Sequence, residues 1–389
     1  MSLRPLPLLL ILFLSATQAQ TDNPTHEAPI VVDGHNDVLG RVMSGGDMEA
    51  WNSSGHSDLP RFRRGGLHVQ VFSIWVPSRK TGDEAWRFAL AEIDTLYAVA
   101  ARNPDRLSVV TDLAQLRRTV ARDGIAGIIG LEGGRCIDGR RDRILELYRR
   151  GLRSFGLTWN YSSVWATCSK DESAGKVRGG LSAKGKDFVR LFDSLGVLID
   201  VSHLGEKSFY DVLRSTRNPV FASHSACAAL RKHHRNLTDT QLRALADNGG
   251  VVMINFYPGF IKAGLGKERV RLSRKMLAEQ AALQKKHPRR DDAYFAAVDV
   301  LVARAEAEGL ATVRTVADHI DHAVRIAGVR HVGLGSDFDG ISFTPVGLAD
   351  VTDLPVLTRE LRRRGYSNHD IRAILGGNFL RIFAAVCGS

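Results

Sequence analysis

The sequence is poor in cysteine and in long apolar stretches. Four cysteines occur among 389 residues, and no two of them form a C-x-x-C pair. So few cysteines exclude a disulfide-stabilised scaffold and a zinc finger. The apolar run from Leu8 to Leu14 is too short to span a bilayer. The thiols are expected to be free or to form at most one or two bridges, among Cys136, Cys168, Cys227 and Cys387.

Residues 1–19 have the composition of a secretory signal peptide. An early Arg precedes the apolar run, and the small side chains of Thr17 and Ala19 follow it. No cysteine comes directly afterwards, and the C-terminal residues contain no second apolar tail, so neither kind of lipid anchor is expected. We therefore expect an exported protein, periplasmic or secreted, without a stable membrane anchor. The remainder, residues 20–389, is expected to be a single domain.

Positive charge is in excess, with a formal net charge of +11. This balance permits binding to anionic partners but does not specify one. Part of the excess lies in Arg-rich stretches such as RELRRRGYSNHDIR, residues 359–372, whose spacing is typical of a solvated helix face. We therefore expect small substrates and no nucleic-acid partner, and the sequence leaves a homodimer open.

Eight short apolar or β-branched runs alternate with longer helical patterns. Apolar strands separated by helices are typical of a parallel sheet that is covered on both faces, and eight such units fit a (β/α)₈ barrel. An open doubly wound sheet is the alternative, but no G-x-G-x-x-G follows the first run. The expected strands lie at 29–34, 68–76, 126–134, 154–159, 196–203, 219–225, 249–257 and 331–340.

A basic, Ala-rich helical insertion is expected at about 261–315, before the last of these strands. Its apolar spacing fits plain packing on the barrel. A lid or an oligomer contact is the alternative role for this insertion.

Polar side chains recur where the expected strands end. In a (β/α)₈ barrel all these ends converge on one face, where active sites are built. The first strand is followed by two such residues, and because these are two positions apart they should project together. The residues, in strand order, are His35 and Asp37, Glu132, His203, His224, Tyr257, and Asp337 with Asp339.

Three imidazoles and four carboxylates at one place would repel each other or stay unsatisfied without a cation. Neutral imidazoles and ionised carboxylates are suitable ligands for divalent metals, and one carboxylate can bridge two ions. Taken singly, a buried His is more often a hydrogen-bonded core residue, and an Asp that ends a strand is commonly a helix cap. Their recurrence at successive strand ends favours a metal site.

The motifs around these residues resemble those of a known family. In chain order they are DGHND, GLEGG, GLRSFGLTWN, GVLIDVSH, FASHSACAALRKHHRN, INFY, GLGSDFDG and ILGGNFLRIF, from about residue 30 to 383. Together they are similar to the membrane dipeptidase (renal dipeptidase) family, zinc peptidases of the amidohydrolase-like barrel class.

The resemblance implies two zinc ions bridged by Glu132. One ion would also be held by His35 and Asp37, and the other by His203 and His224. It further implies that a hydroxide between the ions attacks the amide carbon of a dipeptide. Asp337, which matches the family's catalytic carboxylate, would take the proton from water and pass it to the leaving amine.

The resemblance also implies substrate contacts. Arg235 would clamp the C-terminal carboxylate of the dipeptide, a task that suits a planar guanidinium. Tyr257 would lie near that carboxylate or near the developing oxyanion. Trp159 and Ser162 depart from the well-known animal members, which have His and Asn there. An indole donates one hydrogen bond but cannot carry charge, so we expect Trp159 to reshape the cavity and alter substrate preference, for example toward a D-configured C-terminal residue.

The predicted function is therefore hydrolysis of dipeptides that have a free C-terminal carboxylate. Another carboxylate-bearing amide, such as an N-acyl amino acid or a lactam, would use the same metal ligands and remains the enzymatic alternative. The third hypothesis is a non-catalytic binding protein of the same family. Inactive relatives typically lose a metal ligand, whereas all five expected ligands and Asp337 are present here.

Overall fold

The computed structural model describes residues 29–177 and 179–388, so the expected signal peptide at 1–19 lies outside the described residues. Within the described part, nine parallel strands form one sheet. They are β1 (Val32–Asn36), β2 (Val69–Trp75), β3 (Leu107–Val109), β4 (Ile125–Glu132), β5 (Leu152–Gly156), β6 (Leu198–Asp200), β7 (Phe221–Ser225), β8 (Val251–Ile254) and β9 (Val332–Leu334).

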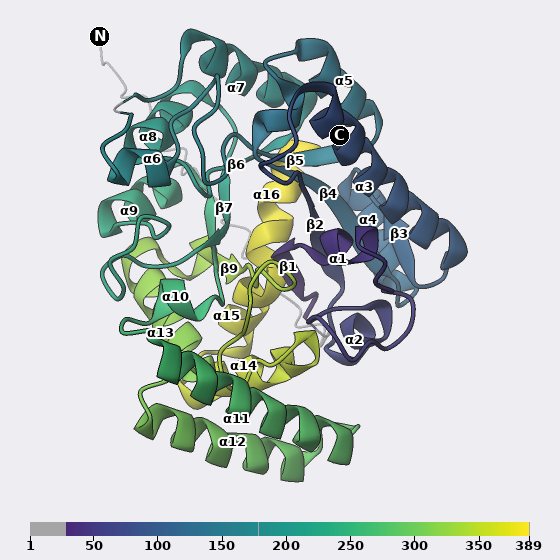
Figure 1. The fold of residues 1–389 in the computed structure, drawn as a ribbon, viewed down its shortest axis with the longest axis vertical. Coiled ribbons are helices and arrows are strands. Elements are labelled where there is room, and N and C mark those ends of the chain that lie inside the picture. The colour runs from purple at the N-terminus through teal and green to yellow at the C-terminus, as the bar shows by residue number, and fades with distance from the viewer. Residues whose placement is uncertain (1–28, 178, 389) are drawn as a thin grey trace, which may run out of the picture.

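Eight of these strands follow one another around a barrel, in the order β1-β2-β4-β5-β6-β7-β8-β9. The circle is joined just beyond β9. There the Asp337 amide donates to the His35 carbonyl (3.1 Å), and the Asp37 amide donates to the Phe338 carbonyl (2.9 Å). Helices surround this barrel (Figure 1). The structure thus confirms the (β/α)₈ barrel and excludes the open doubly wound sheet.

Strand β3 was not expected from the sequence. It has three residues, too few to show an alternating or continuous apolar pattern. It pairs with the first residues of β4, Leu107 opposite Ile125, whereas β5 pairs with later ones, Gly156 opposite Glu132. Because β2 pairs along β4 from Ala126 to Glu132, β3 and β5 share the other edge of β4.

The long helices follow the strands and cover them. They are α3 (Gly82–Arg102), α4 (Leu113–Ala121), α5 (Arg141–Arg149), α7 (Ala183–Leu195), α8 (Glu206–Ser215), α9 (Asp239–Asp247), α11 (Lys267–Lys286), α12 (Asp292–Ala307), α13 (Val313–Ala327), α14 (Leu354–Arg363) and α16 (Asn378–Cys387). The short helices are α1 (Val38–Met43), α2 (Leu59–Arg64), α6 (Ser169–Ser173), α10 (Pro258–Ile261) and α15 (Asn368–Arg372), with the single turns η1 (Gly134–Ile137), η2 (Val329–His331), η3 (Val351–Asp353) and η4 (Ala373–Gly377).

Alternate residues of each strand belong to two different apolar clusters, as the twofold repeat of a strand requires. Val71 of β2 and Met253 of β8 pack with Phe379 and Phe383 of α16. Their neighbours, such as Phe72, join the larger cluster formed with the outer helices. Helix α16 contacts β6, β8 and β9 and lies behind the barrel in the view of Figure 1. It therefore covers the barrel at the end opposite the carboxyl ends of the strands.

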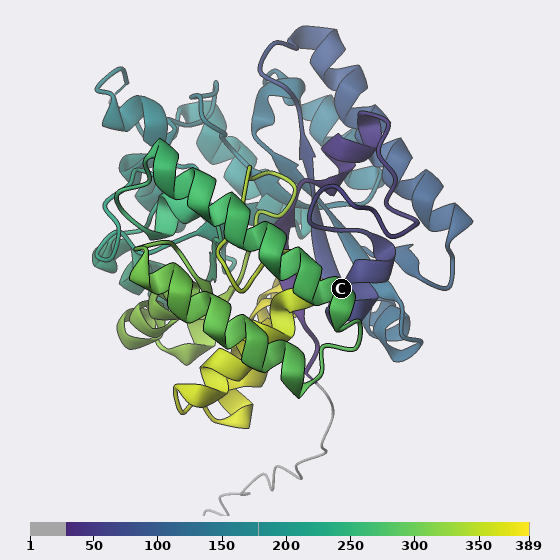
Figure 2. The same ribbon diagram turned by 60° about the horizontal axis from the view of Figure 1, so that its bottom comes forward.

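The expected insertion at about 261–315 contains α11 and α12, which lie side by side across one end of the molecule (Figure 2). A buried carboxylate ties both helices to the barrel. Gln280 of α11 donates to Asp353 (2.7 Å), and the Tyr294 hydroxyl of α12 donates to the same side chain. Gln280 also accepts from the Gly347 amide (2.8 Å). Packing on the barrel is thus observed for this pair of helices.

All four cysteines are buried and unpaired, which agrees with the free-thiol alternative. Among the helices of the described residues, none combines the length and the apolar character needed to cross a bilayer.

We predict that Phe155→Ala destabilises the barrel by about 3–5 kcal/mol. Phe155 of β5 is fully buried, and its ring packs on those of Phe192 (centroids 4.5 Å apart) and Trp165 (6.2 Å). Urea denaturation followed by circular dichroism measures the change. The matched control is Val164→Ala, at a side chain in the same region that is 56% exposed, which should stay within about 0.5 kcal/mol. Equal midpoints for the two variants would contradict the packing described here.

Candidate metal centre and substrate cavity

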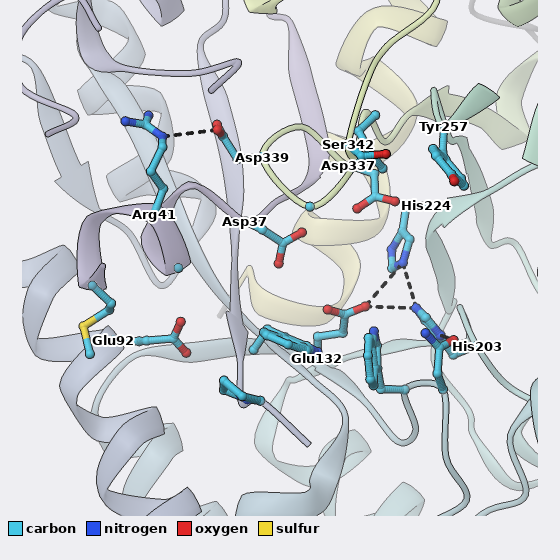
Figure 3. Close-up of a pocket in the computed structure, with 18 of the residues that line it drawn as sticks. Asp37, Arg41, Glu92, Glu132, His203, His224, Tyr257, Asp337, Asp339 and Ser342 are labelled. Atoms are coloured by element: carbon cyan, nitrogen blue, oxygen red, sulfur yellow. Dashed lines mark hydrogen bonds and ion pairs between the residues drawn. The ribbon is translucent and has the colours of Figure 1, made fainter. Parts of the chain in front are cut away.

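A cavity of about 870 Å³ opens at the carboxyl ends of the strands. His35 is buried beside this cavity, close to two of the lining carboxylates. Figure 3 shows several of the lining side chains turned toward one another. The expected site residues that line the cavity are Asp37, Glu132, Trp159, His203, His224, Arg235, Tyr257 and Asp337.

His35 and Asp37 project together, as their spacing predicts. Strand β1 ends at Asn36, and Asp37 occupies the position before the first turn of α1. Its carboxylate makes no capping bond to that helix and instead lies 3.4 Å from His35 Nε2. Asp37 therefore does not cap α1 with its side chain, which was the structural alternative for an Asp that ends a strand. His35 Nε2 is itself buried without a hydrogen-bond partner.

Glu132, the last residue of β4, lies between two sets of imidazoles. Its Oε2 atom is 3.6 Å from His35 Nε2. Its Oε1 atom is 2.9 Å from His203 Nε2 and 3.4 Å from His224 Nε2. One carboxylate therefore presents each of its oxygens to a different set of ligand atoms, the arrangement that a bridging carboxylate requires.

Two of the imidazoles are oriented by hydrogen bonds that their Nδ1 atoms donate. His224 Nδ1 lies 2.7 Å from the Ser223 hydroxyl, which donates onward to Asp200 (2.5 Å). His203 Nδ1 lies 3.2 Å from the Asn160 side-chain oxygen. Both Nδ1 atoms thus face acceptors, which leaves lone pairs on the two Nε2 atoms, 3.0 Å apart. Lone pairs converging beside a carboxylate oxygen form a donor set for a cation.

Two of the three imidazoles are neutral. By contrast, against the effect of burial, the charges of Asp37 and Glu132 raise the pKa of His35 well above its usual value, so a metal ion would displace a proton from His35. Burial, and then the charge of Arg235, lower the pKa of His203 to about 3. Burial and the charge of His35 hold the pKa of His224 well below its usual value. Both imidazoles are therefore neutral at pH 7, the state that binds metal. Although burial opposes ionisation, the charge of His35 keeps the pKa of Glu132 well below its usual range.

Asp337 lies at the same face, after β9, with a carboxylate oxygen that accepts from the Asn255 amide (2.9 Å). Burial raises its pKa to about 7, against the opposing charge of His35, and the negative charge of Asp37 adds to the rise. The charge of a nearby divalent cation would favour the ionised form. One ligand atom each of Asp337, Asp37 and His35 lies within 4.8 Å of the other two, so Asp337 stands directly beside the expected metal ligands.

Unusual backbone geometry occurs at two of the site residues and at a glycine beside the carboxylates of Asp37 and Asp337. Asp337 has a φ of +63° and His203 a φ of +68°, in the left-handed region that few side chains other than glycine adopt. A Cβ atom at Gly340 would lie 2.1 Å from Asp37 Oδ2 and 2.6 Å from Asp337 Oδ1. The glycine that ends the GLGSDFDG motif therefore lets the loop pass directly beside both carboxylates.

Arg235 presents its guanidinium to the cavity although the residue is only 3% exposed. It donates to the His224 carbonyl (3.2 Å) and lies 5.5 Å from the centre of the Phe260 ring. Its Nε atom has no partner among the described residues. Tyr257 packs its ring on Phe260 (centroids 4.9 Å apart). A buried cation with an unused donor at the wall of a cavity suits an anionic substrate group.

Trp159 forms part of the wall beside His203, with ring centroids 6.4 Å apart, and packs edge-on against Trp75 (5.0 Å). Ser162 does not line the cavity. Its hydroxyl accepts from the Cys168 amide (3.1 Å) and holds the loop. Of the two departures from the family pattern, only Trp159 therefore acts on the shape of the cavity.

Asp339, expected among the converging carboxylates, faces away from the ligands. It accepts from the His56 amide (3.0 Å) and pairs with Arg41 Nε (3.3 Å), as Figure 3 shows for Arg41. Asp339 thus positions loops at the rim of the cavity.

The sequence did not single out the residues that orient the ligands. Four such residues lie within the quoted motifs, which was the available signal: Asp200 ends β6, Asn255 follows β8, Ser223 lies within β7, and Asn160 lies in the loop after β5. Glu92 comes from the middle of α3 and lines the cavity without any comparable signal in the sequence.

Comparison with known proteins agrees with this geometry. The family model "Membrane dipeptidase (Peptidase family M19)" matches residues 20–387, and the chain therefore belongs to this family of metallopeptidases.

Solved structures of relatives share the fold. The dipeptidase AC, a metallopeptidase of family M19, is 28% identical, with 93% of this chain and 100% of that one covered and a TM-score of 0.75. A metallopeptidase from Rhodobacter sphaeroides, liganded with a phosphinate mimic of the dipeptide L-Ala-D-Ala, is 27% identical (92% and 100% covered, TM-score 0.74). The probable dipeptidase PvdM from Pseudomonas aeruginosa is 26% identical (93% and 96% covered, TM-score 0.75).

We predict that Ser223→Ala weakens the binding of a divalent metal roughly 10- to 100-fold, because His224 loses the hydroxyl that orients its ring. Competition between the apoprotein and a chromogenic chelator measures this affinity. Ser173→Ala is the matched control, since that exposed hydroxyl on α6 contacts only the Lys170 carbonyl. Unchanged affinity in Ser223→Ala would show that the Asp200–Ser223 pair does not support the site.

Proposed function

We propose that this protein is a dinuclear zinc dipeptidase that hydrolyses dipeptides with a free C-terminal carboxylate. The observation that carries the proposal is the position of Glu132 in a cavity that also contains Arg235. One carboxylate oxygen of Glu132 faces His35, and the other faces His203 and His224. His35 and Asp37 would hold one ion with Glu132, and His203 and His224 would hold the other. The orphaned His35 Nε2 and the facing Nε2 atoms of the other imidazoles fit such ions.

Bound zinc would polarise the scissile carbonyl and lower the pKa of water to near neutrality. The residues of the chain would supply the rest of the chemistry. Arg235 would bind the substrate carboxylate and so set the position of the scissile amide relative to Glu132. Asp337, held by Asn255, would take a proton from the attacking water and deliver it to the leaving amine nitrogen.

The substrate class follows from the size and the charge of the cavity. About 870 Å³ is a volume suited to a small molecule rather than a folded polypeptide. The relative from Rhodobacter sphaeroides was solved with a mimic of L-Ala-D-Ala, so a D-configured second residue is included among the proposed substrates. In the proposal, Trp159 limits the space beside His203 and thereby contributes to this choice.

We also propose that the protein acts after export, in the periplasm or outside the cell, because residues 1–19 have the pattern of a signal peptide. Small peptides would be its partners there.

The first test combines metal content with activity. We expect the purified protein to contain about two zinc ions per chain by elemental analysis and to hydrolyse L-L or L-D dipeptides. Treatment with a chelator should abolish turnover, and added zinc should restore it. Full activity of a rigorously metal-free sample would refute the proposal. Two bound metals with turnover of N-acyl amino acids but no dipeptide would instead favour the alternative amidohydrolase.

A second test addresses the carboxylate clamp. Arg235→Lys should raise the KM for dipeptides roughly 10- to 100-fold with a smaller effect on kcat, because an ammonium cannot form paired bonds to a carboxylate. Dipeptide amides, which lack the carboxylate, should be poor substrates of the wild type and should be little affected by the substitution. Arg190→Lys, at a side chain that is 65% exposed on α7, is the control. Equal losses for dipeptides and their amides would contradict the assigned contact.

A further inference from the structure

One buried carboxylate in the cavity is not used by the metal site. Glu92 of α3 lines the cavity, is 1% exposed, and has an Oε2 atom without a hydrogen-bond partner. Of the cations that line the cavity near this end, Arg41 pairs with Asp339, Lys80 pairs with Glu84, and Arg79 is exposed to solvent. Among the described residues, no Lys or Arg pairs with Glu92. Burial, with the charges of Asp37 and Glu132, holds the pKa of Glu92 well above its usual range, and a cation placed beside this carboxylate would favour its ionised form.

Glu92 and Arg235 lie at opposite ends of the cavity. In Figure 3, Asp37 and Glu132 separate Glu92 from His224, His203 and Tyr257. Arg235 belongs to the far side, because it donates to the His224 carbonyl and packs on Phe260, which contacts Tyr257. An anion-binding end and a cation-binding end therefore lie on either side of the metal ligands.

Part of the wall beside Glu92 is apolar, although Arg41, Arg79 and Lys80 also line the cavity. Phe88 lies one helical turn before Glu92 on the same face of α3 and also lines the cavity. Met43, another lining residue, contacts Thr95 one turn further along this helix (3.1 Å). Trp75 completes the wall. Apolar walls that end in a buried carboxylate complement an aliphatic chain that ends in a cation.

We propose that Glu92 selects dipeptides whose N-terminal residue has a cationic side chain, such as lysine, ornithine or arginine. This inference rests on the proposed function: with its carboxylate at Arg235 and its scissile amide at Glu132, a dipeptide directs its N-terminal residue toward Glu92. The α-ammonium is the other cation of that residue. It is bonded to the carbon next to the scissile carbonyl and therefore lies beside the metal ligands, whereas Glu92 belongs to neither close group of ligand atoms.

The test compares two substrates that differ only in charge. Lysyl-alanine and norleucyl-alanine have side chains of similar length and shape, but norleucine lacks the ammonium. We expect wild-type kcat/KM to be at least tenfold higher for lysyl-alanine, with L- or D-alanine in second place. Glu92→Gln, which keeps the size of the side chain, should remove this preference by raising the KM for lysyl-alanine while norleucyl-alanine is cleaved as before.

Asp94→Asn is the matched control, because this carboxylate lies on the same helix but is 63% exposed and pairs with Arg150. It should leave both substrates unaffected. If Glu92→Gln does not fold, the comparison of the two substrates in the wild type still decides the question.

Two results would overturn the inference while the proposed function stands. The first is equal kcat/KM of the wild type for lysyl-alanine and norleucyl-alanine. The second is an equal loss of kcat/KM in Glu92→Gln for lysyl-alanine, norleucyl-alanine and alanyl-alanine. This result would show that Glu92 binds the α-ammonium group and not the side chain. Hydrolysis of no dipeptide at all by the zinc-loaded wild type would overturn the proposed function itself.

Discussion

The constraint on which the site depends is the burial of Glu132 among three imidazoles. A carboxylate at 7% exposure needs close partners, and His35 faces one oxygen of Glu132 while His203 and His224 face the other. The same low exposure keeps two of these imidazoles neutral, so that their lone pairs are available. Burial thus gathers ligand atoms that a divalent cation could bind. The surrounding hydrogen bonds keep these atoms directed at one place.

The barrel provides the geometry that this set of ligand atoms requires. Parallel strands bring residues far apart in the chain to one face, and the Ser223–Asp200 and Asn160 contacts then fix the rings. The backbone is left-handed at His203 and at Asp337, and both side chains line the cavity. The cavity that results has a direction, with Arg235 at one end and Glu92 at the other. In our proposal, Arg235 binds the C-terminal carboxylate of a dipeptide and so orients it. Glu92 then distinguishes N-terminal residues by the charge of their side chains.

Much of this arrangement was predictable because it depends on short-range pattern. Each of the eight expected strands corresponds to a strand of the barrel, and the nine expected site residues lie at one cavity or directly beside it. The three-residue strand β3 has too little sequence to show a pattern. Asp339 satisfies the same rule as Asp337, yet it turns toward Arg41, because a contact between residues 298 positions apart cannot be read from spacing. Glu92 lies on α3, and the residues around it in the sequence do not indicate that one face of this helix borders the cavity.

The sequence by itself determined which residues could bind metal and on which strands they stand. Strand periodicity and the common direction of parallel strands follow from local chain geometry. Only the tertiary structure decided how those residues are used. Whether a carboxylate meets an imidazole, an arginine or an empty cavity depends on which distant segments pack against it, and on how much water that packing removes. Asp37, Asp339 and Glu92 are three acids near one cavity, and packing alone places one against an imidazole, one in an ion pair and one without a cationic partner among the described residues.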